Sequence, residues 1–302
     1  HALEVLAAAG GKLVVKELKA QKISAQVLKA LTADGLIRLE NRRIMRDSYR
    51  EAESVRTEVE LTADQKTAIA AMEPAVQART YQGFLLKGVT GSGKTQVYIE
   101  MAGKVRQTGR QVIVLVPEIA LTGQVVMAFK AYFANDIVVM HSRLSLAERN
   151  DAVLRVRRGQ AGIIIGARSA LFTPAGDVGL IIMDEEQDMS YKQDESPRYH
   201  AKVVAEELAK IHQAVFLLGS ATPSLESYYR AKSGDLTLLN MPNRIGNLPL
   251  PIVQCVDMRQ ELRMGNRHIM SAALRQLIEA TMAQKQQIII MLNRRGFSTF
   301  VM

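Results

Sequence analysis

The sequence has a single cysteine, Cys255, among 302 residues. One thiol cannot form an internal disulfide, and alone it cannot build a cysteine-cluster metal site, so a reducing, cytoplasmic setting is expected. No apolar run approaches the ~18 residues that a membrane-spanning helix needs, and we expect no membrane association. No signal-like segment follows His1, and because the chain opens on histidine rather than methionine we expect it to be part of a longer protein.

The sequence also lacks the bias of a disordered or fibrous chain. Hydrophobic residues make up 48% and charged residues 23% of it, which is the balance of a globular protein, and its length gives room for roughly two domains. Internal repeats and low-complexity tracts are absent. Lys and Arg number 39 against 30 Asp and Glu, and the resulting net charge of +9 fits a polyanionic partner without establishing one.

The first 54 residues are predicted to form a small winged-helix domain. A helix over 2–9 ends at Gly10-Gly11, Ser24 caps a second helical pattern that ends at Gly35, and two short apolar runs within 36–45 suggest a hairpin. Such modules bind DNA or dock on other proteins. Eleven basic residues face nine acidic ones up to position 60, so both alternatives stay open.

A polar linker over 47–60 leads into strands that alternate with helices, and we place a second domain at 55–244. The strands are short, nearly continuous apolar runs, which are typical of a parallel sheet buried on both faces. The predicted strands are 84–86, 112–116, 137–140, 162–165, 180–183 and 215–218. The fold class is therefore α/β, with a doubly wound parallel sheet.

A proline-bearing crossover follows, and residues 245–302 are predicted to begin a further α/β lobe. A helix over 271–284 and a strand over 288–292 are expected, and the lobe is expected to continue beyond Met302. Arg294 and Arg295 are candidates for contact with DNA or nucleotide, and a structural turn is the equal alternative.

The segment at 88–95 reads GVTGSGKT and matches the phosphate-binding P-loop, G-x-x-x-x-G-K-[ST]. It follows an apolar strand and precedes a helical run. Glycines let backbone N–H groups converge on phosphate oxygens, Lys94 is placed to reach the β- and γ-phosphates, and Thr95 to ligate Mg²⁺. A glycine-rich turn without nucleotide is the alternative, and this context favours ATP.

Two carboxylates follow the apolar strand at 180–183, 90 residues after Lys94. Asp184 is expected to hold Mg²⁺ through water, as in a Walker B motif, and Glu185 to orient and deprotonate the attacking water. The alternative for either residue is an acidic helix cap. The expected catalytic residues are Lys94, Asp184 and Glu185.

Further segments resemble the motifs of superfamily-two helicases. DEEQ at 184–187 and SAT at 220–222 resemble motifs II and III, and LTADQ at 61–65 resembles the glutamine motif, in which Gln65 would read adenine. PEIALT at 117–122 and GARS at 166–169 resemble motifs Ia and Ib, where Thr122, Arg168 and Ser169 would contact a single strand. The residues expected to bind the nucleotide are Gln65, Gly88, Val89, Thr90, Gly91, Ser92, Gly93, Lys94 and Thr95.

From about residue 61 onward the chain is similar to the PriA family of replication-restart DNA helicases (primosomal protein N′). The segments that carry the resemblance are those at 88–95, 115–122, 141–145, 166–172, 184–202, 219–227, 256–261 and 293–297. A RecA-like helicase lobe behind a winged helix, with the start of a second RecA-like lobe, fits the family's order. The family has histidine where this sequence has Gln187, a difference that bears on how DNA binding is coupled to hydrolysis.

Residues 189–200 correspond to the family's aromatic-rich loop and interleave aromatic with cationic side chains. Tyr191 and Tyr199 are expected to stack on bases, while Lys192 and Arg198 meet phosphates. A solvated surface loop is the alternative. His141 and the arginines at 155, 157 and 158 are weaker candidates, because a capped loop histidine and a solvated helix face explain them equally well.

The resemblance implies an ATP-dependent 3′-to-5′ DNA helicase that recognises stalled forks and helps to restart replication by primosome assembly. The implied partners are forked and single-stranded DNA, single-stranded DNA-binding protein and primosome proteins, in a monomer of the bacterial cytoplasm associated with the nucleoid. The family's transition-state arginine and zinc-binding cysteines lie beyond 297, so no zinc site and poor ATPase activity are expected of this chain alone. A winged-helix regulator with an ATP-dependent switch and an RNA helicase are the competing hypotheses.

Overall fold

A computed structural model describes residues 1–39 (without 12, 14 and 22), 60–117, 124–142, 144–247 and 252–291. The chain divides into one unit over His1–Asn247 and a second over Leu248–Met302. None of the described helices is long and apolar enough to span a membrane.

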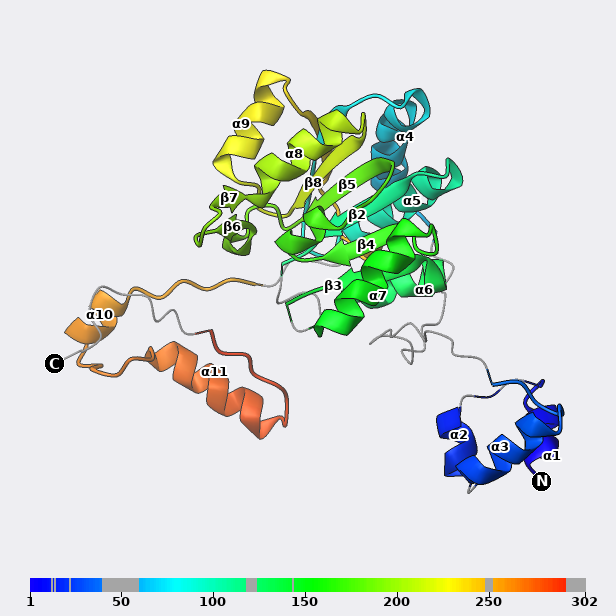
Figure 1. Cartoon of the computed structure of the whole chain (residues 1–302). Helices are drawn as coiled ribbons and strands as arrows, with labels where there is room; N and C mark the ends of the chain where they lie inside the picture. Colours follow the sequence, from blue (N-terminus) through cyan, green and yellow to red (C-terminus); the bar gives the residue numbers. More distant parts are fainter. Residues whose placement is uncertain are drawn as a thin grey trace. The chain divides into compact units, whose positions relative to one another are not determined.

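The centre of the first unit is a seven-stranded sheet in which all pairs of neighbouring strands are parallel (Figure 1). Its order is β3-β4-β2-β5-β8-β1-β9. The bounds are β1 Gln82–Gly88, β2 Gln111–Leu115, β3 Ile137–Met140, β4 Ile163–Gly166, β5 Val178–Asp184, β8 Val215–Ser220 and β9 Thr237–Met241. The predicted parallel α/β sheet is confirmed. The edge strand β9 was not predicted, because its half-exposed residues do not form an apolar run.

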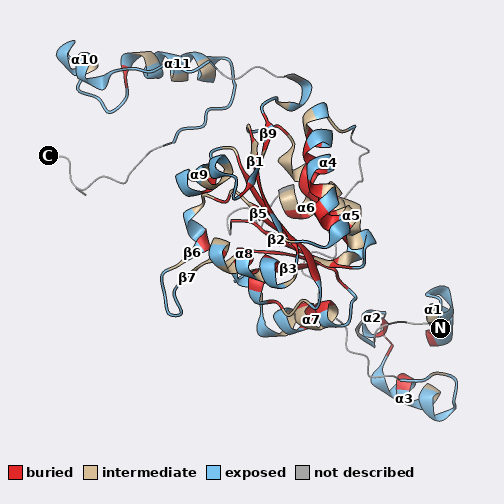
Figure 2. Ribbon diagram, turned by 90° about the horizontal axis from the view of Figure 1, so that it is seen from above, coloured by how far each residue is buried: buried red, intermediate tan, exposed pale blue. Residues whose placement is uncertain are grey.

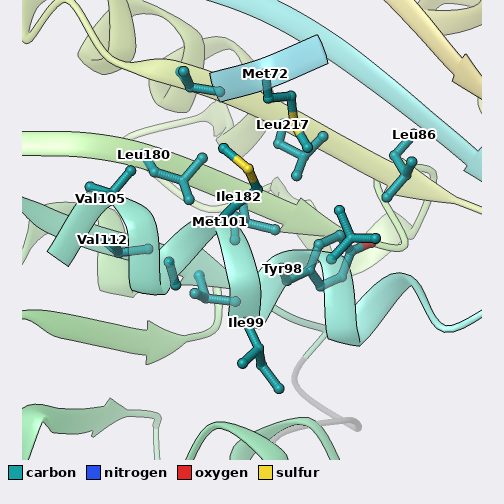
Figure 3. Close-up of a cluster of buried hydrophobic side chains, with 14 of the residues drawn as sticks. Met72, Leu86, Tyr98, Ile99, Met101, Val105, Val112, Leu180, Ile182 and Leu217 are labelled. Carbon is teal, nitrogen blue, oxygen red and sulfur yellow. The ribbon is translucent and has the colours of Figure 1, made fainter. Parts of the chain in front are cut away.

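Helices cover both faces of the sheet, as Figure 2 shows. One face carries α4 (Ala63–Ala78), α5 (Lys94–Gln107) and α6 (Gln124–Phe133), and the other carries α7 (Leu146–Arg157), α8 (Ala201–Ile211) and α9 (Leu225–Ser233). In the first layer Met101 and Tyr98 of α5 and Met72 of α4 pack over Ile182 and Leu217 of the sheet (Figure 3). These five side chains are fully buried, so the sheet and helix α5 form a rigid base for the loops at the strand ends.

Local caps and short elements complete this lobe. Thr62 and Ser145 begin α4 and α7 with capping boxes, in which the cap hydroxyl and the side chain three residues later bond each other's backbone N–H groups. The antiparallel strands β6 (Lys192–Gln193) and β7 (Tyr199–His200) form a small hairpin. The 3₁₀ turns are η2 Ala134–Asp136, η3 Arg168–Phe172, η4 Met189–Tyr191 and η5 Ile245–Asn247.

The N-terminal residues form three helices, α1 (Ala2–Ala8), α2 (Val15–Ala20) and α3 (Ala25–Ala33), around a small apolar cluster. Ser24 caps α3 as predicted, with its hydroxyl accepting from the Val27 N–H at 3.4 Å. The predicted hairpin is only partly described: residues 36–39 form no strand, and 40–45 lie outside the described residues. The winged-helix domain therefore stays a prediction, as does its boundary at 54.

The described residues of the second unit contain two helices, α10 (Met258–Arg263) and α11 (Ala272–Ala283). The helix expected over 271–284 corresponds to α11, which Ser271 caps. Residues 288–291 of the expected strand are not in strand conformation, and Leu292, Arg294 and Arg295 lie outside the described residues.

Candidate nucleotide and nucleic-acid site

The two predicted halves of the nucleotide site lie at the same edge of the sheet. Strand β8 lies between β1 and β5, and its register pairs Lys87 with Ser220 and Asp184 with Gly219. The loop that follows β1 and the carboxylates at the end of β5 therefore lie at the carboxyl ends of the two strands that flank β8. In open α/β sheets this is the edge at which ligands bind.

The loop after β1 has the backbone geometry of a phosphate cradle. Gly91 and Gly93 adopt φ values of +82° and +81°, which L-residues rarely adopt, and Gly93 begins helix α5. A side chain at Gly88 would place its Cβ 2.5 Å from Ser92 Oγ, so any larger residue there would displace the neighbouring side chains of the loop. Backbone N–H groups of such a loop and of a helix N-terminus attract phosphate, and the residues present therefore fit a nucleotide.

Lys94 faces this cradle from the first turn of α5. Its Nζ donates a hydrogen bond of 3.0 Å to the Gly88 carbonyl, and its positive charge opposes the rise that burial causes in the pKa of Asp184. Thr95 is half-buried in the same turn. Lys94 and Asp184 thus lie at the same edge of the sheet, where a site for a phosphate chain and its metal needs them.

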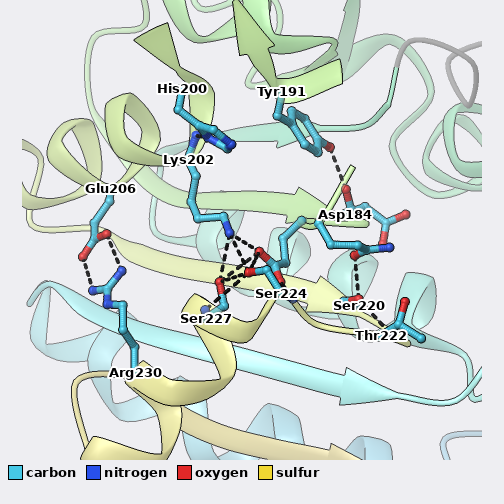
Figure 4. Close-up of polar contacts among 12 residues, drawn as sticks. Asp184, Tyr191, His200, Lys202, Glu206, Ser220, Thr222, Ser224, Ser227 and Arg230 are labelled. Carbon is cyan, nitrogen blue, oxygen red and sulfur yellow. Dashed lines mark hydrogen bonds and ion pairs between the residues drawn. The ribbon is translucent and has the colours of Figure 1, made fainter. Parts of the chain in front are cut away.

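Asp184 is held by two buried tyrosines. Tyr98 Oη donates to its carboxylate oxygen Oδ1 at 2.8 Å. Tyr191 Oη donates to its backbone carbonyl at 2.6 Å (Figure 4). Burial raises the pKa of Asp184 above its ordinary value, against the opposing effects of the Tyr98 bond and the Lys94 charge. An ionised carboxylate in this position gains from a bound cation, so Asp184 fits the role of a magnesium ligand.

Glu185 adopts φ of +45°, in the left-handed region that non-glycine residues seldom occupy. The neighbouring Gln187 holds its side chain, because Gln187 Nε2 donates to Glu185 Oε2 at 2.8 Å. Strained backbone of this kind persists only where the surroundings fix it, and it is common at functional sites. The carboxylate of Glu185 therefore has a defined position beside Asp184.

Gln187 continues this contact to the segment after β8. Ser220 Oγ donates to Gln187 Oε1 at 2.6 Å and accepts a hydrogen bond of 2.9 Å from the Thr222 N–H (Figure 4). The two segments that resemble motifs II and III are thus joined by one chain of hydrogen bonds. Glutamine makes both contacts at the position where histidine was expected.

Sequence reasoning missed a buried polar cluster next to these residues. Glu186 accepts hydrogen bonds from the Ser224 N–H at 2.7 Å and from Ser227 Oγ at 2.9 Å, and it forms an ion pair with Lys202 Nζ (Figure 4). Burial alone would raise the pKa of Glu186, but the hydrogen bonds from Lys202 and Ser224 bring it below its ordinary value. Nothing in the residue spacing could have indicated these partners, because only the fold brings them together.

The structure corrects the role expected of Gln65. Its side chain is fully buried, with Oε1 accepting from the Thr62 N–H at 2.8 Å and Nε2 donating to the Gly93 carbonyl at 3.1 Å. A Cβ on Gly93 would approach Gln65 Nε2 to 2.4 Å. Gln65 therefore braces the phosphate loop from behind, and in this structure it has no exposed amide edge for an adenine base.

The two segments expected to contact DNA adjoin each other. Arg168 Nη1 donates to the carbonyls of Ser190 at 2.9 Å and Lys192 at 2.6 Å, which fixes the start of the β6–β7 hairpin against η3. Ser169 is exposed beside it. Arg168 thus has a structural task that the resemblance did not indicate.

Within the hairpin region the tyrosines differ. Tyr191 is only 1% exposed, so the expectation that it stacks on a base is not met: its ring lies in the core and its hydroxyl bonds Asp184. Tyr199 is half-buried and packs edge-on against Phe172, with the ring centroids 5.4 Å apart. The Phe172 side chain is 62% exposed, which makes it the aromatic surface that sequence reasoning overlooked.

The remaining residues that were expected to contact DNA are Lys192, Arg198 and Thr122. Lys192 and Arg198 are exposed at the hairpin, with Lys192 in an ion pair of 3.2 Å to Asp194. Thr122 lies outside the described residues. Arg155, one of the weaker candidates, donates from Nη2 to the Asn135 carbonyl at 2.5 Å.

Comparison with known proteins matches residues 62–231 to the DEAD/DEAH box helicase family. The chain is 43% identical over 295 residues to a replication restart protein PriA of Bacillus subtilis, and 43% identical over 305 residues to that of Synechocystis. The matches cover 97% and 99% of this chain but only 37% and 36% of the relatives. A solved structure of RecG bound to a three-way DNA junction is similar over 62% of this chain and 24% of that chain, at 22% identity and a TM-score of 0.46.

Proposed function

Because the chain belongs to the DEAD/DEAH box helicase family, we propose that it is the first motor lobe of an ATP-dependent DNA helicase that acts in replication restart. The observation that carries the proposal is the sheet topology, because the loop with Lys94 after β1 and the carboxylates at the end of β5 lie at one edge of the sheet, on either side of β8. A phosphate cradle and a metal-binding carboxylate at one edge are what nucleoside triphosphate hydrolysis needs.

In the proposed reaction each residue has a separate task. Backbone N–H groups of the 88–93 loop and Lys94 bind the phosphates, while Thr95 and Asp184 hold Mg²⁺, which neutralises the developing negative charge. Glu185 accepts the proton of the attacking water, and Gln187 keeps its carboxylate in place. The buried Tyr98 fixes the orientation of Asp184.

The proposed DNA surface lies over η3 and the β6–β7 hairpin. Thr122 is a further proposed DNA contact on the ground of the sequence resemblance alone. Phe172 and Tyr199 offer aromatic faces to unpaired bases, and Lys192 and Arg198 offer cations to phosphates. Arg168 joins the two elements, and Ser169 extends the polar edge. Tyr191 is left out because it is buried.

The finer proposals follow from the similarity to proteins named replication restart protein PriA. We propose 3′-to-5′ translocation, recognition of stalled forks, and cooperation with single-stranded DNA-binding protein and primosome proteins in a bacterial cell. A second lobe would supply an arginine worth ~10³–10⁵ in rate, so the 302-residue chain by itself is proposed to hydrolyse ATP slowly.

The test is the ATPase rate of a protein that contains this chain at the relatives' full length, with and without forked DNA. We expect strong stimulation by DNA that is lost in Lys94→Ala and in Glu185→Gln and retained in the control Arg267→Ala, a substitution of an exposed residue. A rate that does not respond to DNA would favour an ATP-dependent switch instead. Preferential stimulation by a matched RNA fork would overturn the DNA assignment.

A further inference from the structure

The phosphate loop both donates hydrogen bonds to and accepts them from the segment through which the chain leaves the first unit. This exit segment comprises residues 241–247, from the last residue of strand β9 to the last residue of that unit. Its first residue bonds the loop directly, because the Val89 N–H donates to the Met241 carbonyl at 3.2 Å. Its last three residues form η5.

Two donors of the exit segment reach the tip of the loop. Arg244 Nε donates to the Thr90 carbonyl at 3.1 Å, and the Ile245 N–H donates to the Gly91 carbonyl at 2.9 Å. A Cβ on Gly91 would lie 3.2 Å from Arg244 Nε, so the guanidinium lies close against the glycine. Both outward carbonyls at the tip thus accept hydrogen bonds from one short segment.

The same segment contacts the neighbouring glutamine-motif helix. Asn243 Nδ2 donates to Asp64 Oδ2 at 3.1 Å, near the beginning of α4. The side chain of Ile245 lies against Gly93, where an added Cβ would approach Cδ1 to 2.8 Å. Ile245 is nevertheless 46% exposed and Arg244 is half-buried, so hydrogen bonds rather than burial hold the segment in place.

The Arg244 contact has an electrostatic consequence for phosphate binding. The Thr90 carbonyl and the Gly91 N–H belong to one peptide group, so a cation bonded to the oxygen withdraws electron density and strengthens the N–H as a donor. The N–H groups of a P-loop are the donors to phosphate. A positive charge behind this peptide therefore favours an anion in front of it.

We propose that Arg244 is a positioning residue for the nucleotide, which orients and polarises the Thr90–Gly91 peptide toward the phosphates. This inference rests on the proposed function. Because coupling between two binding events is reciprocal, a nucleotide in the loop strengthens the attachment of the exit segment as much as that attachment strengthens nucleotide binding. Nucleotide occupancy is thereby communicated to the segment that leads out of the lobe.

The experiment measures ATP binding to the 302-residue chain in the presence of Mg²⁺ by calorimetry, together with hydrogen–deuterium exchange of the peptide covering 241–247. We expect Arg244→Ala to lower the affinity for ATP about tenfold, which equals about 1.4 kcal/mol of binding free energy. Arg244→Lys is expected to recover part of this loss. ATP is expected to slow exchange at the Ile245 N–H in the unsubstituted chain and not in Arg244→Ala. The matched control is Arg267→Ala, which removes an equal charge from an exposed position.

The outcomes separate this inference from the function on which it rests. ATP affinity within twofold of the unsubstituted chain in Arg244→Ala, beside lost binding in Lys94→Ala, would overturn the role of Arg244 alone. An equal loss in Arg267→Ala would reduce the effect to net charge and overturn it as well. A chain that binds no ATP at all would overturn the proposed function and this inference together.

Discussion

The Ser220 hydroxyl donates a hydrogen bond of 2.6 Å to the side-chain oxygen of Gln187, whose nitrogen in turn donates to Glu185. The end of β8 thus holds, through Gln187, the residue proposed to activate water. A hydrogen bond to a charged group contributes about 1.5–3 kcal/mol, so its loss is expected to be measurable in the rate.

We predict that Ser220→Ala and Gln187→Ala each lower the DNA-stimulated kcat for ATP about tenfold or more and leave the affinity for ATP unchanged, because both release the Glu185 carboxylate. Steady-state kinetics of the full-length protein check this. Thr222→Val is the control, since Thr222 joins the network only through its backbone N–H. A changed KM with unchanged kcat would contradict the assignment.

The ion pair of Lys202 with the buried Glu186 is predicted to stabilise the fold in a pH-dependent way. Lys202→Met leaves a buried carboxylate without its cation and is expected to cost about 3–5 kcal/mol of unfolding free energy at pH 7. The control Lys210→Met removes an exposed lysine and is expected to cost about 0–1 kcal/mol.

The sign of the pH dependence follows from the lowered pKa of Glu186. A depressed carboxyl pKa contributes stability that is present above the ordinary value of 4.5 and is lost as the pH falls through the folded-state pKa. Without Lys202 the carboxyl is free to protonate, so the difference between Lys202→Met and the unsubstituted chain is expected to shrink as the pH falls toward 4. Denaturant titrations from pH 7 to 4 measure it, and a constant difference would argue against the pair.

The ionised carboxylate of Asp184 is predicted to lower the unfolding free energy of the lobe while it allows a metal ion to bind. Burial raises its pKa, so the ionised form opposes folding at neutral pH and this penalty disappears as the pH falls. Asp184→Asn is expected to raise the unfolding free energy by about 0.5–2 kcal/mol and to weaken binding of ATP with Mg²⁺. Thermal unfolding and calorimetry test both effects, and the exposed Asp235→Asn should change neither.

Gln65 is predicted to support the binding of every nucleoside triphosphate equally, whatever its base. Because its amide bonds the Gly93 carbonyl instead of facing solvent, Gln65→Ala is expected to lower the affinities for ATP and for GTP by the same factor, roughly tenfold. Calorimetric titration with the two nucleotides decides the matter, with the exposed Gln82→Ala as control. Selective loss of ATP would restore the adenine-reading role that the sequence suggested.

Phe172 is predicted to bind unpaired bases. Stacking is worth about 1–3 kcal/mol per base, so Phe172→Ala is expected to weaken the binding of single-stranded DNA by at least fivefold. Arg198→Ala is expected to weaken the same binding in a way that depends on the salt concentration. Fluorescence anisotropy with a labelled oligonucleotide measures this. Tyr191→Phe, which keeps the buried ring, and Leu225→Ala, at an 85% exposed position on α9, should bind normally, and equal weakening in all four variants would refute the surface.

The sequence by itself determined the parallel α/β lobe and the places in it of the two halves of the candidate nucleotide site. Continuous apolar strands can only be buried on both faces, and a glycine-rich loop ending in Lys94-Thr95 has few uses other than binding phosphate. Asp184 and Glu185 were predictable for a similar reason, because carboxylates directly after a buried strand lie at the functional edge of the sheet.

Only the tertiary structure decided what the neighbouring residues do. Gln65 and Tyr191 had polar motifs that suggested contact with ligands, but both are buried, since α4 and η4 pack against the lobe. The partners of Glu186 and of the Thr90 and Gly91 carbonyls come from segments 16 to 154 residues away in the chain. Hydrogen bonds at such separations depend on how the helices and loops pack on the sheet. Local sequence patterns do not determine that packing.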